Sequence, residues 1–153
     1  MLYYNMNLST ILLISFLIIS TFGTLFHFTH NWFKKGLLLH IFSALNESTW
    51  EHMKLLVLPT LLAMVFQIFV FKGRYENTNN AMLVLLVVEI VTMPLIFEPL
   101  RLMFKKVHFV ITIIIFYVCI LFGLLAEYFI LQNSVMIFNE IIAGLLTLGV
   151  ILL

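Results

Sequence analysis

Apolar residues fill five long runs of this chain, and short polar stretches separate the runs. The runs are residues 8–27, 50–71, 81–100, 107–131 and 134–153. A hydrocarbon core of ~30 Å needs ~20 helical residues to cross it, and each run has about that length. The alternation of apolar and polar residues that is typical of membrane barrels is absent. The pattern therefore predicts an all-α bundle of five membrane-spanning helices, because helices satisfy their own backbone groups in lipid.

The connections between the runs differ in character. Residues 72–80, "KGRYENTNN", have the composition of a turn, and "LQNS" at 131–134 predicts a tight turn that makes the last two helices antiparallel neighbours. The longest connection is 29–49. Its middle, "GLLLHIFSAL", is too short to span a membrane and too apolar for a free loop. We expect it to form a short interfacial segment between the first two helices.

Composition changes the picture in one respect: it makes a lipid bilayer the expected partner. Hydrophobic residues make up 63% of the chain and charged residues 10%, whereas a soluble domain is near half and a quarter. The net charge of +1 argues against nucleic acid as a partner. The lone Cys119 cannot form an internal disulfide. Residues 1–153 are expected to form a single integral-membrane domain.

Basic residues predict the orientation of this domain. They gather in the first and third connections, whereas the second connection carries two and the fourth carries none. The residues of the first and third connections are Lys34, Lys35, Arg101, Lys105 and Lys106. Because Lys and Arg are enriched on the cytoplasmic side, we expect a multi-pass protein of the cell membrane with its N-terminus outside.

The five histidines are expected to lie at one membrane face. His27 and His30 end the first run, His40 lies in the first connection, and His52 and His108 begin the second and fourth runs. Helices that cross a membrane alternate in direction, so these positions share one side. By the orientation above, that side is the cytoplasmic one.

The most polar stretch, "NESTWEHMK" at 46–54, begins the second run and has an explanation as a helix start. Ser48 and Glu51 have the spacing of a capping box, in which each side chain satisfies a backbone N–H of the first turn. Trp50 fits an aromatic anchor at the lipid interface, and Lys54 fits a head-group charge. These roles leave Glu47 and His52 unexplained.

A metal site is the chemical interpretation of the same region. His27 and His30 are three residues apart on one helical face, and Glu51 and His52 follow on the next helix. Imidazoles and a carboxylate in that number suit a divalent metal such as zinc, which would activate water at an open position. The spacing is not the H-E-x-x-H motif. A metal-free acid–base or ion-pair network is the alternative.

An earlier helix start would add a further constraint. If the helix began at Asn46, Glu47 and Glu51 would lie four apart on one face. Their repulsion near lipid would then require a shared proton, a cation or a metal.

Glu89 is a separate signal, because it lies near the middle of the third run. A carboxylate at that depth costs ~2.5 kcal/mol or more, and it is typical of proton or cation pathways. A neutral glutamic acid hydrogen-bonded inside the bundle is the alternative. Glu127 and Glu140 are expected to face each other across the short turn, with an interfacial role.

The same region carries a resemblance to a known family. His27 and Phe28, Trp32 and above all "NESTWEHMKLL" at 46–56 resemble the signature of an uncharacterised family of small bacterial and archaeal integral-membrane proteins. That family has an N-E-S-x-W-E-H-x-K-L motif after a first helix ending in His-Phe. The matching positions are Asn46, Glu47, Ser48, Trp50, Glu51 and His52. The resemblance implies a polytopic membrane protein and brings no established activity.

Two classes of function remain open. The first is a small membrane enzyme, a metal-assisted hydrolase or transferase on a lipid-like substrate at the cytoplasmic interface. Its ligands or acid–base groups would be His27, His30, Glu51 and His52, with Glu47 as general base and with Asn46 and Ser48 positioning the substrate. The alternative is a transporter, channel subunit or accessory protein in which Glu89 lies on an ion or proton path and the His/Glu cluster is a gate or clamp.

Overall fold

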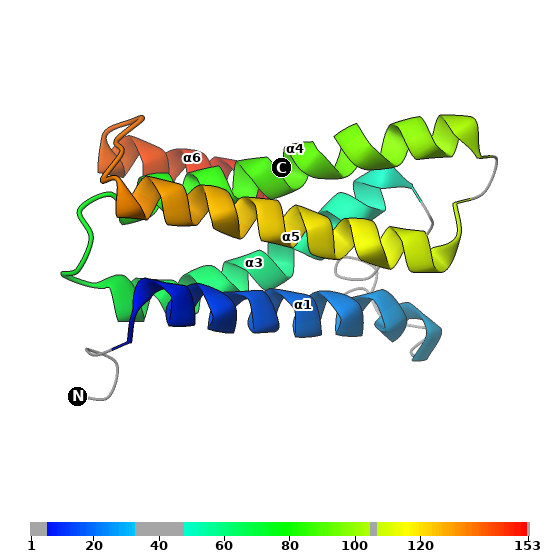
Figure 1. Cartoon of the computed structure of the whole chain (residues 1–153), viewed down its shortest axis with the longest axis horizontal. Coiled ribbons are helices and arrows are strands. Elements are labelled where there is room, and N and C mark those ends of the chain that lie inside the picture. Colours follow the sequence, from blue (N-terminus) through cyan, green and yellow to red (C-terminus); the bar gives the residue numbers. More distant parts are fainter. Residues whose placement is uncertain (1–5, 33–47, 105–106, 153) are drawn as a thin grey trace.

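Five helices make up the described part of the chain in the computed structural model, which covers residues 6–32, 48–104 and 107–152 (Figure 1). The helices are α1 (Leu8–Trp32), α3 (Thr49–Phe71), α4 (Thr78–Met103), α5 (Phe109–Gln132) and α6 (Glu140–Leu152). The prediction of an all-α bundle is confirmed. The expected interfacial segment "GLLLHIFSAL" lies outside the described residues.

Four of these helices are long and apolar enough to cross a membrane. They are α3, α4, α5 and the Leu8–His27 part of α1. Large apolar side chains cover their outer surface, for example Phe69 at 76% exposure and Leu95 at 68%. Soluble monomers rarely expose contiguous apolar surface of this kind, whereas lipid solvates it. The described helices are therefore compatible with a multi-pass membrane protein.

The fifth helix is shorter than the predicted run 134–153. α6 has 13 residues, which corresponds to about 20 Å and is less than the ~30 Å of a hydrocarbon core. The reason lies in Asn80 of α4. Its Oδ1 accepts hydrogen bonds from the backbone N–H groups of Ile137 (3.0 Å) and Phe138 (2.9 Å). These bonds hold the residues before Glu140 in an irregular segment.

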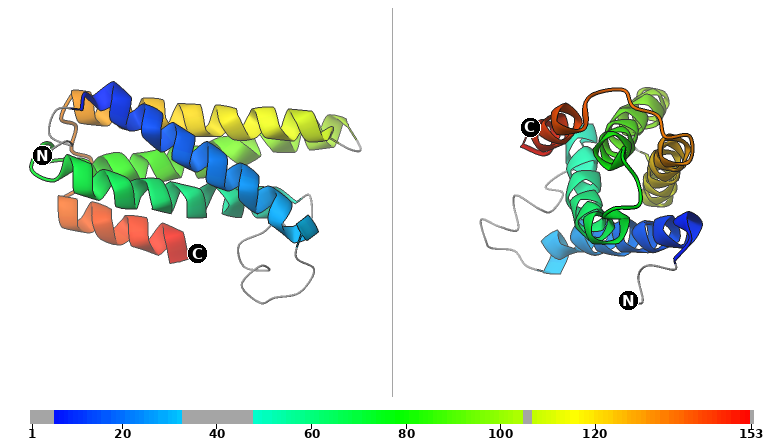
Figure 2. Two further views of the ribbon diagram at one scale, coloured as in Figure 1. Left: turned by 90° about the horizontal axis from the view of Figure 1, so that it is seen from below. Right: turned by 90° about the vertical axis from the view of Figure 1, so that its left-hand side faces the viewer.

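α6 also has a different neighbour from the one that the short turn suggested. We expected it beside α5, but it packs mainly against α4 and runs in the same direction as α4 (Figure 2). Asn77 helps to direct the connection from α5 to α6, because its Nδ2 donates to the carbonyl oxygens of Ile130 (2.7 Å) and Val135 (3.0 Å). A short connection limits how far a helix can move, but side-chain amides decide which neighbour it meets.

We expected Glu140 to face Glu127, and this prediction is wrong. Glu140 instead caps the N-terminus of α4. Its carboxylate accepts hydrogen bonds from the backbone N–H groups of Asn79 (2.8 Å) and Asn80 (3.1 Å). The Nδ2 group of Asn80 donates to the same carboxylate and to the carbonyl oxygen of Phe138 (2.9 Å). An anion suits this position because helix N-termini carry unpaired N–H groups and a positive dipole end.

The start of α3 follows the predicted capping pattern. The Ser48 side chain accepts a hydrogen bond from the backbone N–H of Glu51 at 3.3 Å, and Thr49 is the first helical residue. The N-cap prediction for Ser48 is confirmed. Because α3 begins at Thr49, the alternative start at Asn46 is wrong.

α4 and α5 pack in close contact at Gly123. A Cβ atom at this position would lie 2.6 Å from Cγ of Glu89, 2.9 Å from Cδ1 of Leu85 and 3.1 Å from the Leu85 carbonyl oxygen. Small residues at helix interfaces allow backbones in membranes to pack closely. Gly123 therefore sets the distance between the two helices at the level of Glu89.

We predict that Asn80→Ala destabilises the fold by about 3 kcal/mol, because several hydrogen bonds to buried or half-buried groups are lost together. Thermal unfolding in detergent micelles measures this change. Asn133→Ala is the matched control, since the exposed Asn133 side chain makes one bond to its own helix, at the carbonyl oxygen of Phe129. Equal unfolding temperatures for the two variants would contradict the role of Asn80.

We also predict that Gly123→Ala lowers the free energy of unfolding by about 1–3 kcal/mol, because the added methyl group overpacks the contact of α4 with α5. The same unfolding measurement applies. Gly149→Ala is the control: no neighbouring atom lies within 4 Å of its new Cβ, and alanine favours helix. A neutral Gly123→Ala would show that the helices separate freely at this level.

Candidate functional site

Three histidines of the described residues lie at the same end of the bundle. His27 is near the C-terminal end of α1, His52 is in the first turn of α3, and His108 is the N-cap of α5. The His108 side chain accepts a hydrogen bond from the backbone N–H of Val110 at 3.3 Å. The side chain of His30 and all of His40 lie outside the described residues.

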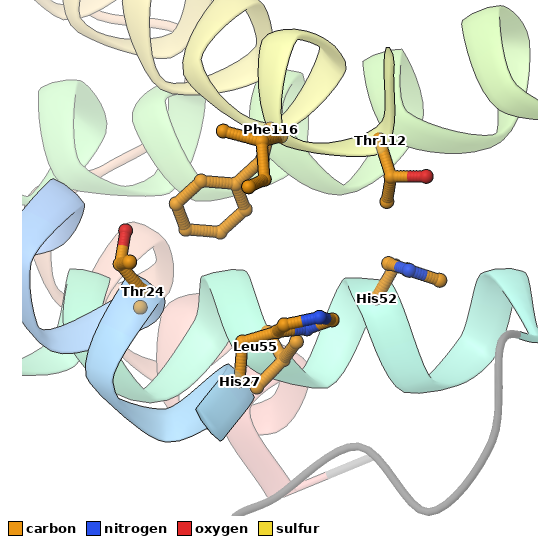
Figure 3. A pocket seen from close by; sticks show the side chains of 8 residues that line it. Thr24, His27, His52, Leu55, Thr112 and Phe116 are labelled. Atoms are coloured by element: carbon orange, nitrogen blue, oxygen red, sulfur yellow. The ribbon is translucent and has the colours of Figure 1, made fainter. Parts of the chain in front are cut away.

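His27 and His52 border a small cavity between α1, α3 and α5. Their ring centroids are 6.3 Å apart. Figure 3 shows Phe116 and Thr112 of α5 on one side of the cavity, with His27 and His52 on the other. The cavity has a volume of about 30 Å³, which is room for a water molecule or two but not for a lipid chain.

Backbone contact orients the ring of His52. Its Nδ1 atom lies 2.8 Å from the carbonyl oxygen of Ser48. Because a carbonyl oxygen only accepts, Nδ1 carries the hydrogen, and Nε2 is then the acceptor atom of the neutral ring. The ring of Phe97 packs 4.9 Å from His52, and that of Phe109 packs 5.2 Å from His27. Ser48 therefore both caps α3 and orients its first histidine.

The charged groups at this end of the bundle form ion pairs that are not part of the cavity lining. Lys54 Nζ lies 2.9 Å from Oε2 of Glu51. The Thr49 hydroxyl donates to Glu98, whose Oε2 lies 2.8 Å from Nη2 of Arg101. Thr49 and Glu98 thus join the start of α3 to the end of α4. This link cannot be predicted from the sequence pattern, because no spacing rule relates two residues that are 49 positions apart on different helices.

The predicted site residues are only partly brought together. His27 and His52 meet at the cavity, Glu51 pairs with Lys54, and Trp50 is 55% exposed at the surface. Asn46 and Glu47 lie outside the described residues, as does the side chain of His30. Within the described ranges, no three His, Cys, Asp or Glu side chains form a group that could hold a metal ion.

Glu89 lies deeper, fully buried between the long helices. The Thr60 hydroxyl of α3 donates to its Oε2 at 2.6 Å. Its Oε1 is buried and has no hydrogen-bond partner within residues 6–32, 48–104 and 107–152. Gly123 of α5 closes the other side, as described above.

A second buried carboxyl group, Glu127 of α5, corrects the expectation of an interfacial role. Gln67 Nε2 donates to Glu127 Oε2 and to the hydroxyl of Ser15 in α1, both at 3.0 Å. The Ser15 hydroxyl in turn donates to the carbonyl oxygen of Ile11 (3.1 Å). In the part of the chain that the structure describes, Oε1 of Glu127 has no hydrogen-bond partner. α5 continues to Gln132, and its inward face carries Glu127 toward Gln67 of α3.

A signal for Glu127 is present in the sequence. Thr112, Cys119, Gly123 and Glu127 are small or polar and are spaced by seven, four and four residues, which places them on one face of a helix. All four are buried. In lipid, the face of a helix that carries such residues is the one that turns inward.

These groups form three levels along α3, which we call the polar column. It consists of His27 with His52, then Thr60 with Glu89, then Ser15 with Gln67 and Glu127. His52, Thr60 and Gln67 are eight and seven residues apart, so the levels are about 12 Å and about 10 Å apart along the helix axis. No Lys or Arg is among the buried residues of the described chain.

Comparison with known proteins gives the family of this chain. Neither the curated proteins nor the solved structures include one that matches it. A family model matches residues 1–153, the full length of the sequence, and it describes a family of unknown function (DUF6512). This match agrees with the resemblance to an uncharacterised family that the sequence carries. The chain therefore belongs to DUF6512, a family of unknown function.

Proposed function

We propose that this chain is an integral membrane protein that moves protons along the polar column. One observation carries the proposal. Glu89 and Glu127 are fully buried between long apolar helices, and each has a carboxyl oxygen for which the described residues provide no hydrogen-bond partner. The described residues place no Lys or Arg in the core to balance them.

Burial and charge together favour a proton as the missing partner. A charged carboxylate without a cation is expensive in an apolar interior, and more so among helices that face lipid. A neutral acid avoids this penalty and holds an exchangeable proton. Thr60 and Gln67 each donate one hydrogen bond to the carboxyl groups, which would stabilise the charged form during transfer.

The number of ligands favours a proton over a metal cation in the column. Calcium takes six to eight oxygen ligands, and magnesium requires near-octahedral coordination. The Glu89 level offers its carboxyl group and the Thr60 hydroxyl. A proton needs a single acceptor atom and no cavity.

His27 and His52 would exchange protons between the column and the aqueous phase. Imidazole takes up and releases protons near neutral pH, and the cavity beside the two rings has room for water. Thr60 lies about 12 Å from His52 along the axis of α3, so proton transfer between the two levels requires water molecules or a helix movement. The basic first and third connections support placing this end at the cytoplasmic face of the cell membrane, with the N-terminus outside.

We predict that Glu89→Gln and Glu127→Gln each lower proton flux about ten-fold or more, because glutamine keeps the shape of glutamate but does not release a proton. The measurement uses proteoliposomes that contain a pH-sensitive dye, with a potassium diffusion potential to drive the protons. Glu76→Gln is the matched control, since Glu76 is exposed between α3 and α4.

Two outcomes would overturn this function. Wild-type proteoliposomes that acidify no faster than protein-free liposomes would exclude proton movement under these conditions. Equal flux in the wild type and in both buried variants would assign the flux to another part of the chain.

A metal-dependent enzyme is the second candidate, and the orientation of His52 favours it. Metal-bound histidines commonly donate their other ring N–H to a backbone carbonyl, which is the contact that Nδ1 makes with Ser48. His27 would be the neighbouring ligand. The ligand role of Glu51 would require its carboxylate to leave Lys54. A bound zinc ion would activate water for hydrolysis or transfer on a lipid-like substrate.

For this candidate we predict about one zinc ion per purified chain, with loss of the metal in His52→Ala and in His27→Ala. Elemental analysis after dialysis against zinc measures the zinc content of each variant. His108→Ala is the control, because its imidazole is exposed at the N-terminus of α5. Zinc content that is unchanged in His52→Ala, or absent from the wild type, would exclude the metal site.

A further inference from the structure

A long groove lies on the face of α3 that points away from the polar column. It has a volume of about 720 Å³, within the range of ~300–1,000 Å³ of ligand-binding pockets. One stripe of α3 forms its main wall, Ile90 of α4 contributes to the lining, and the last described turn of α6 lies across from α3. The lining residues are Trp50, Met53, Lys54, Val57, Leu58, Leu61, Ile90, Val150, Ile151 and Leu152.

The groove is about one membrane leaflet deep. From Trp50 to Leu61 is eleven residues, or about 16 Å of helix, which is half of a ~30 Å hydrocarbon core. Leu61 and Ile90 directly follow Thr60 and Glu89, which are hydrogen-bonded to each other. The inner end of the groove is therefore level with Glu89, and its outer end is at the histidine end of the bundle.

The two ends of the groove differ in chemistry. The inner part is lined by aliphatic side chains, whereas Trp50 and Lys54 form the outer end. Indole rings and lysines are typical of the head-group level of a membrane. Lys54 pairs with Glu51, but an ammonium group has three N–H donors and can also bind a phosphate oxygen.

From this depth and polarity we infer that the groove binds an anionic phospholipid, with one acyl chain along α3 and the phosphate at Lys54. An acyl chain of one leaflet reaches from the head groups to the midplane, which matches the length of the groove. A neutral or zwitterionic head group would gain less from Lys54. The inference is independent of proton movement, since none of the groove residues belongs to the polar column.

The test is native mass spectrometry of the purified chain in detergent, with equal amounts of phosphatidylglycerol and phosphatidylcholine that carry the same acyl chains. We expect the wild type to retain one phosphatidylglycerol. Leu58→Trp, which fills the groove, should lower lipid retention about ten-fold. Lys54→Gln should retain lipid but lose the preference for phosphatidylglycerol. Ile68→Trp, at an exposed position of α3 outside the groove (52% exposed), should match the wild type.

A second measurement does not depend on retention in detergent. The chain has two tryptophans, so Trp32→Phe leaves Trp50 as the only one. Phosphatidylglycerol with brominated chains should quench Trp50 fluorescence in proteoliposomes at a lower lipid fraction than brominated phosphatidylcholine does. Lys54→Gln in this background should make the two quenching curves coincide.

Three results would overturn the inference. The first is equal retention of the two lipids, and equal quenching by them, in the wild type. The second is retention that Leu58→Trp leaves unchanged. The third is a wild-type dimer that Leu58→Trp converts to monomer, which would make a second copy of the chain the occupant of the groove.

Discussion

A polar group buried between long apolar helices has to find its partner inside the protein, and this constraint explains most of the bundle. Gln67 reaches Ser15 and Glu127, Thr60 reaches Glu89, and Asn80 holds the segment before α6. Each contact joins segments that lie far apart in the sequence, so the polar side chains determine which segments meet and at what level. Apolar residues supply an outer surface that is compatible with lipid, but they are too similar along these helices to specify a register.

The two ends of the bundle differ in how their polar groups are paired. Near Asn77, Asn80 and Glu140, side-chain amides and a carboxylate pair with backbone groups of three segments and fasten α4, α5 and α6 together. At the other end, imidazoles border a small cavity and the ion pairs are partly exposed to the surroundings. Between the two ends lie Glu89 and Glu127, each with one carboxyl oxygen for which the described residues provide no hydrogen-bond partner. Function is therefore expected in the middle and at the histidine end rather than at the fastened end.

Hydropathy was sufficient to predict α1, α3, α4 and α5, because a lipid solvent imposes both the length and the helical form of a span. The capping pattern predicted the start of α3 at Ser48. α6 was predicted too long and beside the wrong helix, because the deciding contacts come from Asn77 and Asn80, some 55 residues earlier. Alternating helix direction placed His27 near His52, but it did not show that Glu127 turns inward toward Gln67. To predict this contact, the small-residue face of α5 has to be considered together with Gln67 of α3.

The cap that Glu140 provides has a consequence for how the chain is made. The backbone N–H groups of Asn79 and Asn80 donate hydrogen bonds to this carboxylate, which belongs to a residue about 60 positions later in the sequence. During synthesis, the ribosome releases α4 and all of α5 before Glu140 emerges. Until then, these N–H groups in the first turn of α4 lack the carboxylate partner that the finished fold gives them. The N-terminus of α4 is therefore capped only after α5 and the start of α6 have been made.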